Sequence, residues 1–219
     1  MNATATIEIP AEKFSARLKR ESEELHSTAE HSGFMTKLMK GELSEKSYLR
    51  LLNQYVYLYE ALEKVAQGYR EAGNKMLEPF NQPELARAER IRADIKALGQ
   101  EDIDPALPAT TKYAQRILDS AQSPERFLSH HYLRYLGDLS GGQAVAVLMG
   151  RHYGISSEAL SMYRFDELPK PKIFKDSYRT LLDNAPLSEE ERQNVVDETL
   201  RGFQYNAELF SELMEQESH

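Results

Sequence analysis

The fold of this chain is decided by the stretch YLRYLGDLSGGQ, residues 132–143. We predict that it lies within a helix that opens at Ser123-Pro124-Glu125 and runs towards Gly150, since proline is favoured in the first turn of a helix. An interior glycine makes a helix about 1 kcal/mol less stable than alanine does, so three lower its stability by something on the order of 3 kcal/mol. Gly137 and Gly141 are four residues apart, which leaves one side of this glycine-bearing helix without side chains.

Two explanations of that bare side are open. Tight packing against a second helix is one, because small residues at this spacing let two helix backbones approach closely. A flat ligand lying against a kinked backbone is the other. Gly142 does not help helix packing and weakens the helix further, so the ligand accounts better for all three glycines.

The rest of the chain is predicted to be helical as well. Gly33 and Gly41 are expected to bracket a short connection between helices. Ser188 and Glu191 have the spacing of a capping box, which predicts the start of the last helix. Further helices are expected from Pro10 through Ala29, from Ser44 to Gly68 or Gly73, from Asn81 to Gly99, from Tyr113 to Ala121, from Pro171 through Leu182, and from Ser188 through Leu213. No segment shows the alternation of a strand. We therefore expect an all-α, single-domain, multi-helix bundle over residues 1–219, with residues 1–10 and 215–219 as flexible termini.

Composition and charge exclude several classes of protein. There is no cysteine, which excludes disulfide scaffolds, thiol catalysis and thiolate metal sites. A formal net charge of −8 argues against nucleic acid as the main partner. No apolar stretch approaches the ~20 residues that span a bilayer, residues 1–9 lack the features of a secretory signal, and the C-terminal residues are polar. A cytoplasmic protein without a membrane anchor is expected.

The first helix carries a candidate metal ligand, His26. At helical spacing His26 lies at the border between the apolar stripe of that helix and solvent. Glu30 is four residues further on and can accept a hydrogen bond from one ring nitrogen, which would leave the other nitrogen free for a metal. The alternative is a surface His–Glu pair that adds about 0.2–0.5 kcal/mol to helix stability.

A di-iron centre is disfavoured, although Glu23-x-x-His26 has the spacing found in di-iron carboxylate bundles. Such a centre needs a second motif of this kind, and no other histidine has a glutamate three positions before it. His130 and His131 are expected to be ordinary residues near the start of the glycine-bearing helix.

The residues from His131 to Gln143 resemble the signature of the haem oxygenase family. Other segments match in the order in which that family has them, namely His26-x-x-Ala29-Glu30 with Phe34-Met35, Tyr59-x-Ala61-Leu62-Glu63, Phe174-Lys175-x-x-Tyr178-Arg179, and Phe203-x-x-Asn206-x-x-x-Phe210. The resemblance covers roughly Lys13 to Leu213. The chain is similar to the soluble bacterial members, notably those that release iron from host haem. Both iron acquisition and pigment synthesis stay open as its biological purpose.

The resemblance implies a haem sandwiched between the first helix and the kinked glycine-rich helix. His26 would be the proximal iron ligand and Glu30 its hydrogen-bonded partner, while Gly137 and Gly141 would let the distal helix lie close over the haem. Asp138 would hold the water network that delivers protons during oxygen activation. Residues that would extend this network are Arg134, Tyr59 and Asn206.

The resemblance also implies which residues contact the haem besides His26 and Glu30. They are Lys19, Tyr132, Ser140, Lys175, Arg179 and Phe203, of which Lys19, Tyr132, Lys175 and Arg179 would bind the propionates. Lys175 and Arg179 are four residues apart on one helix and share a face. Glu23 is acidic where some relatives carry a basic residue.

The activity implied is oxidation of haem b, as both cofactor and substrate, to biliverdin with release of carbon monoxide and ferrous iron. The α isomer is expected from the Lys-x-x-Tyr-Arg pattern. The reaction needs O2 and electrons, and the electrons must come from outside because the chain has no flavin or nicotinamide fingerprint. The resemblance implies a flavoprotein reductase or a ferredoxin as the partner that supplies them. Two alternatives stay open: a haem carrier or sensor that never turns over, and a helical oxygenase of the same architecture that uses non-haem iron.

Overall fold

The computed structural model describes residues 12–30 and 33–217, and every regular element in them is a helix. The all-α prediction is therefore confirmed for this part of the chain. The α-helices are α1 (Phe14–Glu30), α2 (Gly33–Lys40), α3 (Glu45–Glu71), α4 (Ala88–Ala97), α5 (Pro108–Asp119), α6 (Pro124–His131), α7 (Gln143–Tyr153), α8 (Pro171–Asp183) and α9 (Glu189–Gln216). Short 3-10 turns form η1 (Pro83–Leu85), η2 (Ser120–Gln122) and η5 (Ser157–Tyr163), and π-helical turns form η3 (Tyr132–Leu136) and η4 (Asp138–Gly142).

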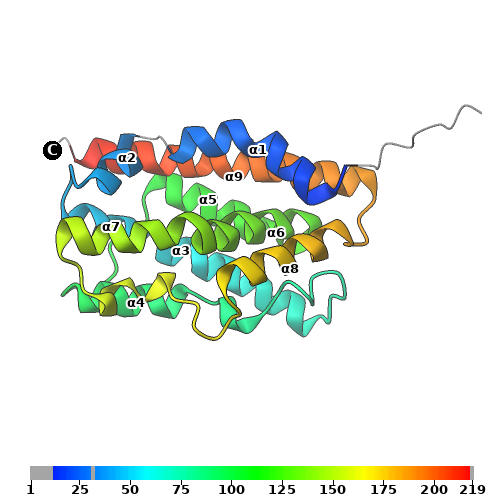
Figure 1. The fold of residues 1–219 in the computed structure, drawn as a ribbon, viewed down its shortest axis with the longest axis horizontal. Coiled ribbons are helices and arrows are strands. Elements are labelled where there is room, and N and C mark those ends of the chain that lie inside the picture. Colours follow the sequence, from blue (N-terminus) through cyan, green and yellow to red (C-terminus); the bar gives the residue numbers. More distant parts are fainter. Residues whose placement is uncertain (1–11, 31–32, 218–219) are drawn as a thin grey trace, which may run out of the picture.

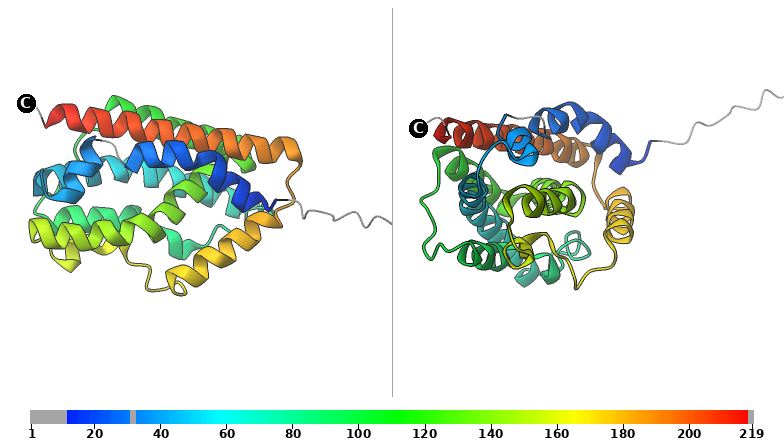
Figure 2. Two further views of the ribbon diagram at one scale, coloured as in Figure 1. Left: turned by 45° about the horizontal axis from the view of Figure 1, so that its top comes forward. Right: turned by 60° about the vertical axis from the view of Figure 1, so that its left-hand side comes forward.

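The glycine-bearing helix, which is the continuous run α6–η3–η4–α7 over residues 124–153, lies in the middle of the bundle (Figure 1). It packs on α3 and α9 through α6, on α2 and η5 through α7, and on α8 through η4. The second figure shows the other helices arranged around it (Figure 2). Helix α1 lies along α9 and also contacts α2 and α8. The two helices expected to sandwich a ligand are thus held by the same neighbours.

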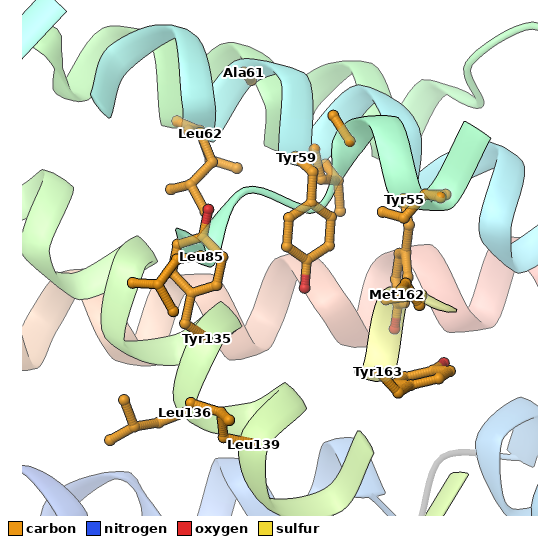
Figure 3. Packing of buried hydrophobic residues seen from close by; sticks show 14 of the residues in the cluster. Tyr55, Tyr59, Ala61, Leu62, Leu85, Tyr135, Leu136, Leu139, Met162 and Tyr163 are labelled. Carbon is orange, nitrogen blue, oxygen red and sulfur yellow. The ribbon is translucent and has the colours of Figure 1, made fainter. Parts of the chain in front are cut away.

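Two long helices begin where their capping residues predict. The hydroxyl of Ser44 accepts the N–H of Ser47 at 3.2 Å before α3, and that of Ser188 accepts the N–H of Glu191 at 3.2 Å before α9. An N-cap of this kind stabilises a helix by ~1 kcal/mol. The buried face of α3 includes Tyr55 and Tyr59, whose side chains point towards the interior of the bundle (Figure 3).

The predicted helix from Asn81 to Gly99 is wrong at its start. Pro83 opens only the turn η1, the chain is extended at Ala86, and α4 begins at Ala88. The reason lies in α3, where the carboxylate of Glu63 accepts the N–H groups of Arg87 at 2.5 Å and of Ala88 at 2.8 Å. A helix begins where its first N–H groups find acceptors, and here the acceptor comes from another helix.

Two other expectations need correction. The segment bracketed by Gly33 and Gly41 is a helix, α2, rather than a connection, and the positive φ of Gly41 (75°) follows its end. At the C-terminus α9 extends to Gln216, and Glu217 accepts hydrogen bonds from Ser47 (2.9 Å) and Arg50 (2.5 Å) on α3. Residues 215 and 216 are therefore helical, and Glu217 is held against α3. Residues 1–10, with the helix start expected at Pro10, and residues 218–219 lie outside the described part.

Within residues 12–30 and 33–217, no helix combines the length and the apolar character needed to cross a bilayer.

Candidate active site

The kink predicted from the glycines takes the form of two π-helical segments, η3 and η4, on either side of Gly137. A π-helix has a wider turn than an α-helix and is frequent at functional sites. The helix axis resumes its ordinary course in α7. The backbone of the glycine-bearing helix is thus irregular just where the glycines and Asp138 lie.

The bare side of this helix is open. A Cβ atom built on Gly137 or on Gly141 would meet no neighbouring atom within 4 Å, and Ser140 between them is exposed. These two glycines therefore do not serve contact with another helix. Gly142 differs, because its Cβ would lie 2.9 Å from Cδ1 of Tyr163 on η5. The explanation of all three glycines by one ligand is wrong for Gly142, which lets η5 pack against the helix.

Four buried polar residues from three helices are joined by hydrogen bonds. The hydroxyl of Tyr59 on α3 donates to Oδ2 of Asp138 on the glycine-bearing helix. Arg134 donates from Nη2 to the hydroxyl of Tyr59 at 3.2 Å and from Nη1 to Oδ1 of Asn206 on α9 at 3.2 Å. The structure thus brings together the residues expected to form one proton-delivery network.

The charges of this network are balanced within the protein. Burial raises the pKa of Asp138, and Arg134 and the hydrogen bond from Tyr59 partly offset that rise. The guanidinium carbon of Arg134 lies 4.4 Å from the centre of the Tyr55 ring and 4.8 Å from that of Tyr59. Nε of Arg134 is buried and has no hydrogen-bond partner among the described protein atoms. A carboxyl group of raised pKa is suited to hold a proton nearer neutral pH.

His26 lies on α1, partly exposed, at the border that its spacing predicts. Its ring meets that of Phe203 on α9 edge to face, with 5.4 Å between centres and 87° between planes. Glu23 and Lys19 occupy the same face of α1, one and two turns before His26 respectively. The side chain of Glu30 lies outside the described residues, so its expected bond to His26 has no structural test.

Helix α8 brings two cations to the other side of the site. Nζ of Lys175 donates to Oγ of Ser140 at 3.0 Å, and Arg179 is exposed and pairs with Asp176 at 2.9 Å. Burial raises the pKa of Tyr132, while Arg179 lowers it and Glu23 raises it. Tyr132 is thus close to charges on both α1 and α8, which places these two helices at the rim of the open glycine side.

Sequence reasoning missed three residues of this region. Tyr55 stacks on Arg134, and its four-residue spacing from Tyr59 on one face of α3 is the signal that could have found it. Gln143 donates to the backbone oxygen of Tyr163 at 2.7 Å and so ties η5 to the helix. His131 is bonded to Tyr178 on α8, and nothing in the local sequence indicates that partner.

These residues fit a flat ligand that carries carboxylates and a metal. An open glycine side admits a flat face, imidazole is a common haem ligand, and ammonium and guanidinium groups suit carboxylates. Among the side chains that the structure describes, no three His, Asp or Glu residues gather as a group that could hold a metal ion by themselves.

Comparisons with known proteins point to one family. A family model described as "Heme oxygenase" matches residues 12–212. The "Heme oxygenase" of Porphyra purpurea is 35% identical over 194 residues, which cover 86% of this chain and 81% of that protein. A structure of heme oxygenase from Leptospira interrogans superposes with a TM-score of 0.85 at 32% identity, over 92% of this chain and 100% of that one. For heme oxygenase-2 from Synechocystis sp. PCC 6803, solved in complex with heme and NO, the TM-score is 0.88 at 29% identity, over 94% and 86% of the two chains.

Proposed function

The chain belongs to the haem oxygenase family, whose reaction yields biliverdin, carbon monoxide and iron, and we propose that it performs this reaction on the open side of the glycine-bearing helix. The observation that carries the proposal is the buried network of Asn206, Arg134, Tyr59 and Asp138, which ends one residue from Gly137. Bound haem would supply the iron that activates oxygen and, as the substrate, the ring that is opened.

His26 would hold the iron from α1, and the glycine-bearing helix would lie over the opposite face. Gly137 and Gly141 keep that face free of side chains, so their backbone can approach the ligand closely. A side chain there would occupy the space that oxygen needs. Partial exposure of His26 and its contact with Phe203 support this assignment, because the ring is oriented by a neighbour and still accessible.

Asp138 would hold and deliver the protons of the reaction. Its raised pKa keeps the carboxyl closer to the protonated form, and Tyr59 occupies Oδ2, so proton exchange with water is left to Oδ1. Arg134 donates to the hydroxyl oxygen of Tyr59, which strengthens the bond that Tyr59 donates in turn. Asn206 and the ring of Tyr55 hold Arg134 in place for that purpose.

Lys175 and Arg179 would bind the two propionates of haem b, with Lys19 and Tyr132 beside them. On this proposal the cations set the rotation of the macrocycle in its plane, and the α isomer of biliverdin results. Glu23 on α1 acts on Tyr132, and its negative charge would weaken propionate binding next to it on α1. O2, an external flavoprotein reductase or ferredoxin, and a cytoplasmic location belong to the same proposal.

Spectroscopy of the purified protein tests the function directly. Haemin is titrated into the protein, a reductant is added in air, and the absorption spectrum is followed. The proposal predicts that the Soret band gives way to the spectrum of biliverdin. A Soret band that persists under reductant and oxygen would instead identify a carrier or sensor of haem.

A further inference from the structure

Helix α8 is attached to the glycine-bearing helix by two side-chain hydrogen bonds that differ in kind. One joins Nδ1 of His131 to the hydroxyl of Tyr178 at 2.9 Å, and both residues are buried. The other runs from Nζ of Lys175 to Oγ of Ser140 at 3.0 Å, at an exposed position. On α8, Lys175 and Tyr178 are three residues apart and share a face. On the glycine-bearing helix, His131 directly precedes the π-helical segment η3, and Ser140 lies within the π-helical segment η4.

The His131–Tyr178 bond lies inside an aromatic cluster. The two rings stack at 16° with 5.8 Å between centres, and the ring of Tyr135 meets His131 edge to face at 4.7 Å. Phe80 packs on Tyr178 at 5.0 Å from the opposite side. Burial lowers the pKa of His131 to about 3, so the ring is neutral near pH 7 and offers one donor and one acceptor nitrogen. Packing within the cluster holds the rings of His131 and Tyr178 in place, and the hydrogen bond sets the orientation of one ring relative to the other.

An anionic ligand would compete for only one of the two attachments. A carboxylate of the ligand would draw the ammonium group of Lys175 away from Ser140 or share it with Ser140, because that group has three donors. The bond between His131 and Tyr178 has no such competitor, because both residues are covered by protein. It is therefore the attachment that remains to hold α8 in register when the site is filled.

We propose that His131, acting through Tyr178, is a positioning residue that sets the place of Lys175 and Arg179 over the haem and so determines which edge of the ring is opened. The proposal rests on the proposed function of this site. Arg179 follows Tyr178 directly and Lys175 precedes it by three residues, so any rotation of α8 moves both cations together. Without the bond, α8 can rotate about its axis, and the cations would hold the propionates in more than one rotation of the macrocycle.

The variants Tyr178→Phe and His131→Phe test this inference, because each removes the hydrogen bond and keeps an aromatic ring in the cluster. Tyr57→Phe is the matched control, since it removes a tyrosine bond of 2.8 Å to the backbone oxygen of Asp104, far from α8. Three quantities are measured: haem affinity from the Soret titration, the in-plane orientation of ferric haem from its hyperfine-shifted methyl resonances in proton NMR, and the biliverdin isomers by chromatography. The first two need no turnover.

The expected result is a second set of haem methyl resonances in both variants, a loss of affinity of about three- to tenfold, and a mixture of biliverdin isomers. The double variant should be no worse than either single one, because both remove the same bond. Tyr57→Phe should match the wild type in all three. One set of resonances and a single isomer in Tyr178→Phe would overturn the proposal even if stability fell.

Failure of the proposed function is recognised separately. If the wild type itself bound haem and made no biliverdin, the function would be wrong, while the NMR comparison would still decide the positioning role. Should Tyr178→Phe not fold, the same three quantities are measured in His131→Leu, whose side chain has no hydrogen-bonding atom and which leaves Tyr178 intact. The same two outcomes then support or overturn the proposal.

Discussion

The hydroxyl of Tyr59 donates a hydrogen bond to the carboxylate of Asp138, which lies 79 positions further along the chain. Both groups are buried, and Arg134 approaches the same hydroxyl from the side of α9. An acidic group with raised pKa is thus held next to a helix face that carries no side chains.

Replacing Asp138 should separate binding of haem from its cleavage. Asp138→Asn keeps the size of the side chain and removes the acid, so haem affinity should stay within about threefold while the rate of biliverdin formation falls roughly a hundredfold. Single-turnover absorption spectra measure the rate, and Asp166→Ala at an exposed position is the control. A normal biliverdin yield from Asp138→Asn would contradict the proton-delivery role.

Removal of the imidazole on α1 should weaken haem binding and abolish turnover. His26→Ala leaves the iron without its protein ligand, and added imidazole should restore part of the activity because it can occupy the vacated space. The Soret position and the biliverdin yield, each with and without imidazole, are the measurements. His152→Ala at the end of α7 is the control, and turnover of His26→Ala equal to that of the control would exclude His26 as the ligand.

Two neighbouring glycines should respond in opposite ways to the same methyl group. Gly141→Ala meets open space and should leave the haem-free protein as stable as before or about 0.5–1 kcal/mol more stable, while haem binding weakens. Gly142→Ala places its Cβ against Tyr163 and should destabilise the protein by about 1–3 kcal/mol. Urea denaturation and Soret titration of both variants check this. If both variants lost the same amount of stability, a Cβ at Gly141 would not face open space, and the assignment of this side as the ligand face would be contradicted.

Charge reversal on α8 should affect the product rather than the fold. Lys175→Glu with Arg179→Glu should weaken haem binding at least tenfold and yield mixed biliverdin isomers, since like charges repel the propionates. Lys170→Glu with Lys172→Glu, at the start of α8, makes the same change in net charge and is the control. Chromatography decides the matter: a single α isomer at wild-type affinity in the double variant would refute the anchoring role.

The stability of the bundle in acid should depend on Glu198 of α9. Burial would raise the pKa of its carboxyl, but hydrogen bonds from His130 and Arg116 outweigh burial and lower it to about 2. Because the folded state binds this proton less tightly than the unfolded chain, with a pKa of about 4.3, the stabilisation is complete above that pH and is lost as the pH falls towards 2. The amount is about 3 kcal/mol.

The corresponding experiment compares urea unfolding at pH 6 and pH 3. Glu198→Gln should be less stable than the wild type at pH 6 and should lose less stability between the two pH values. Asp197→Asn, at the neighbouring exposed carboxylate, should keep the wild-type difference. An unchanged pH dependence in Glu198→Gln would show that another carboxylate governs acid unfolding.

Much of this molecule follows from local rules. Ser44 and Ser188 mark helix starts because a hydroxyl at that position satisfies N–H groups of the same helix, and the apolar spacing of α3 identifies its buried face. The bare side of the glycine-bearing helix likewise follows from the four-residue spacing of Gly137 and Gly141. The pattern of residues 131–143 resembled one family, and the match of the family model over residues 12–212 confirmed it.

Other features had no local cause and were mispredicted or missed. The start of α4 depends on Glu63 of α3, and the need for glycine at 142 depends on Tyr163 of η5. The partner of His131 lies on α8, 47 positions away. In each case the deciding atom comes from an element that is distant along the chain.

The sequence by itself therefore determined most of the helices, their faces and the family, because hydrogen bonding and side-chain periodicity within a helix act over three or four residues. Only the tertiary structure decided which faces meet, that Arg134 joins Tyr59 to Asn206, and that Gly137 and Gly141 face open space while Gly142 does not. The physical reason is that the relative placement of helices results from the close packing of many side chains at once, and no single segment contains that information.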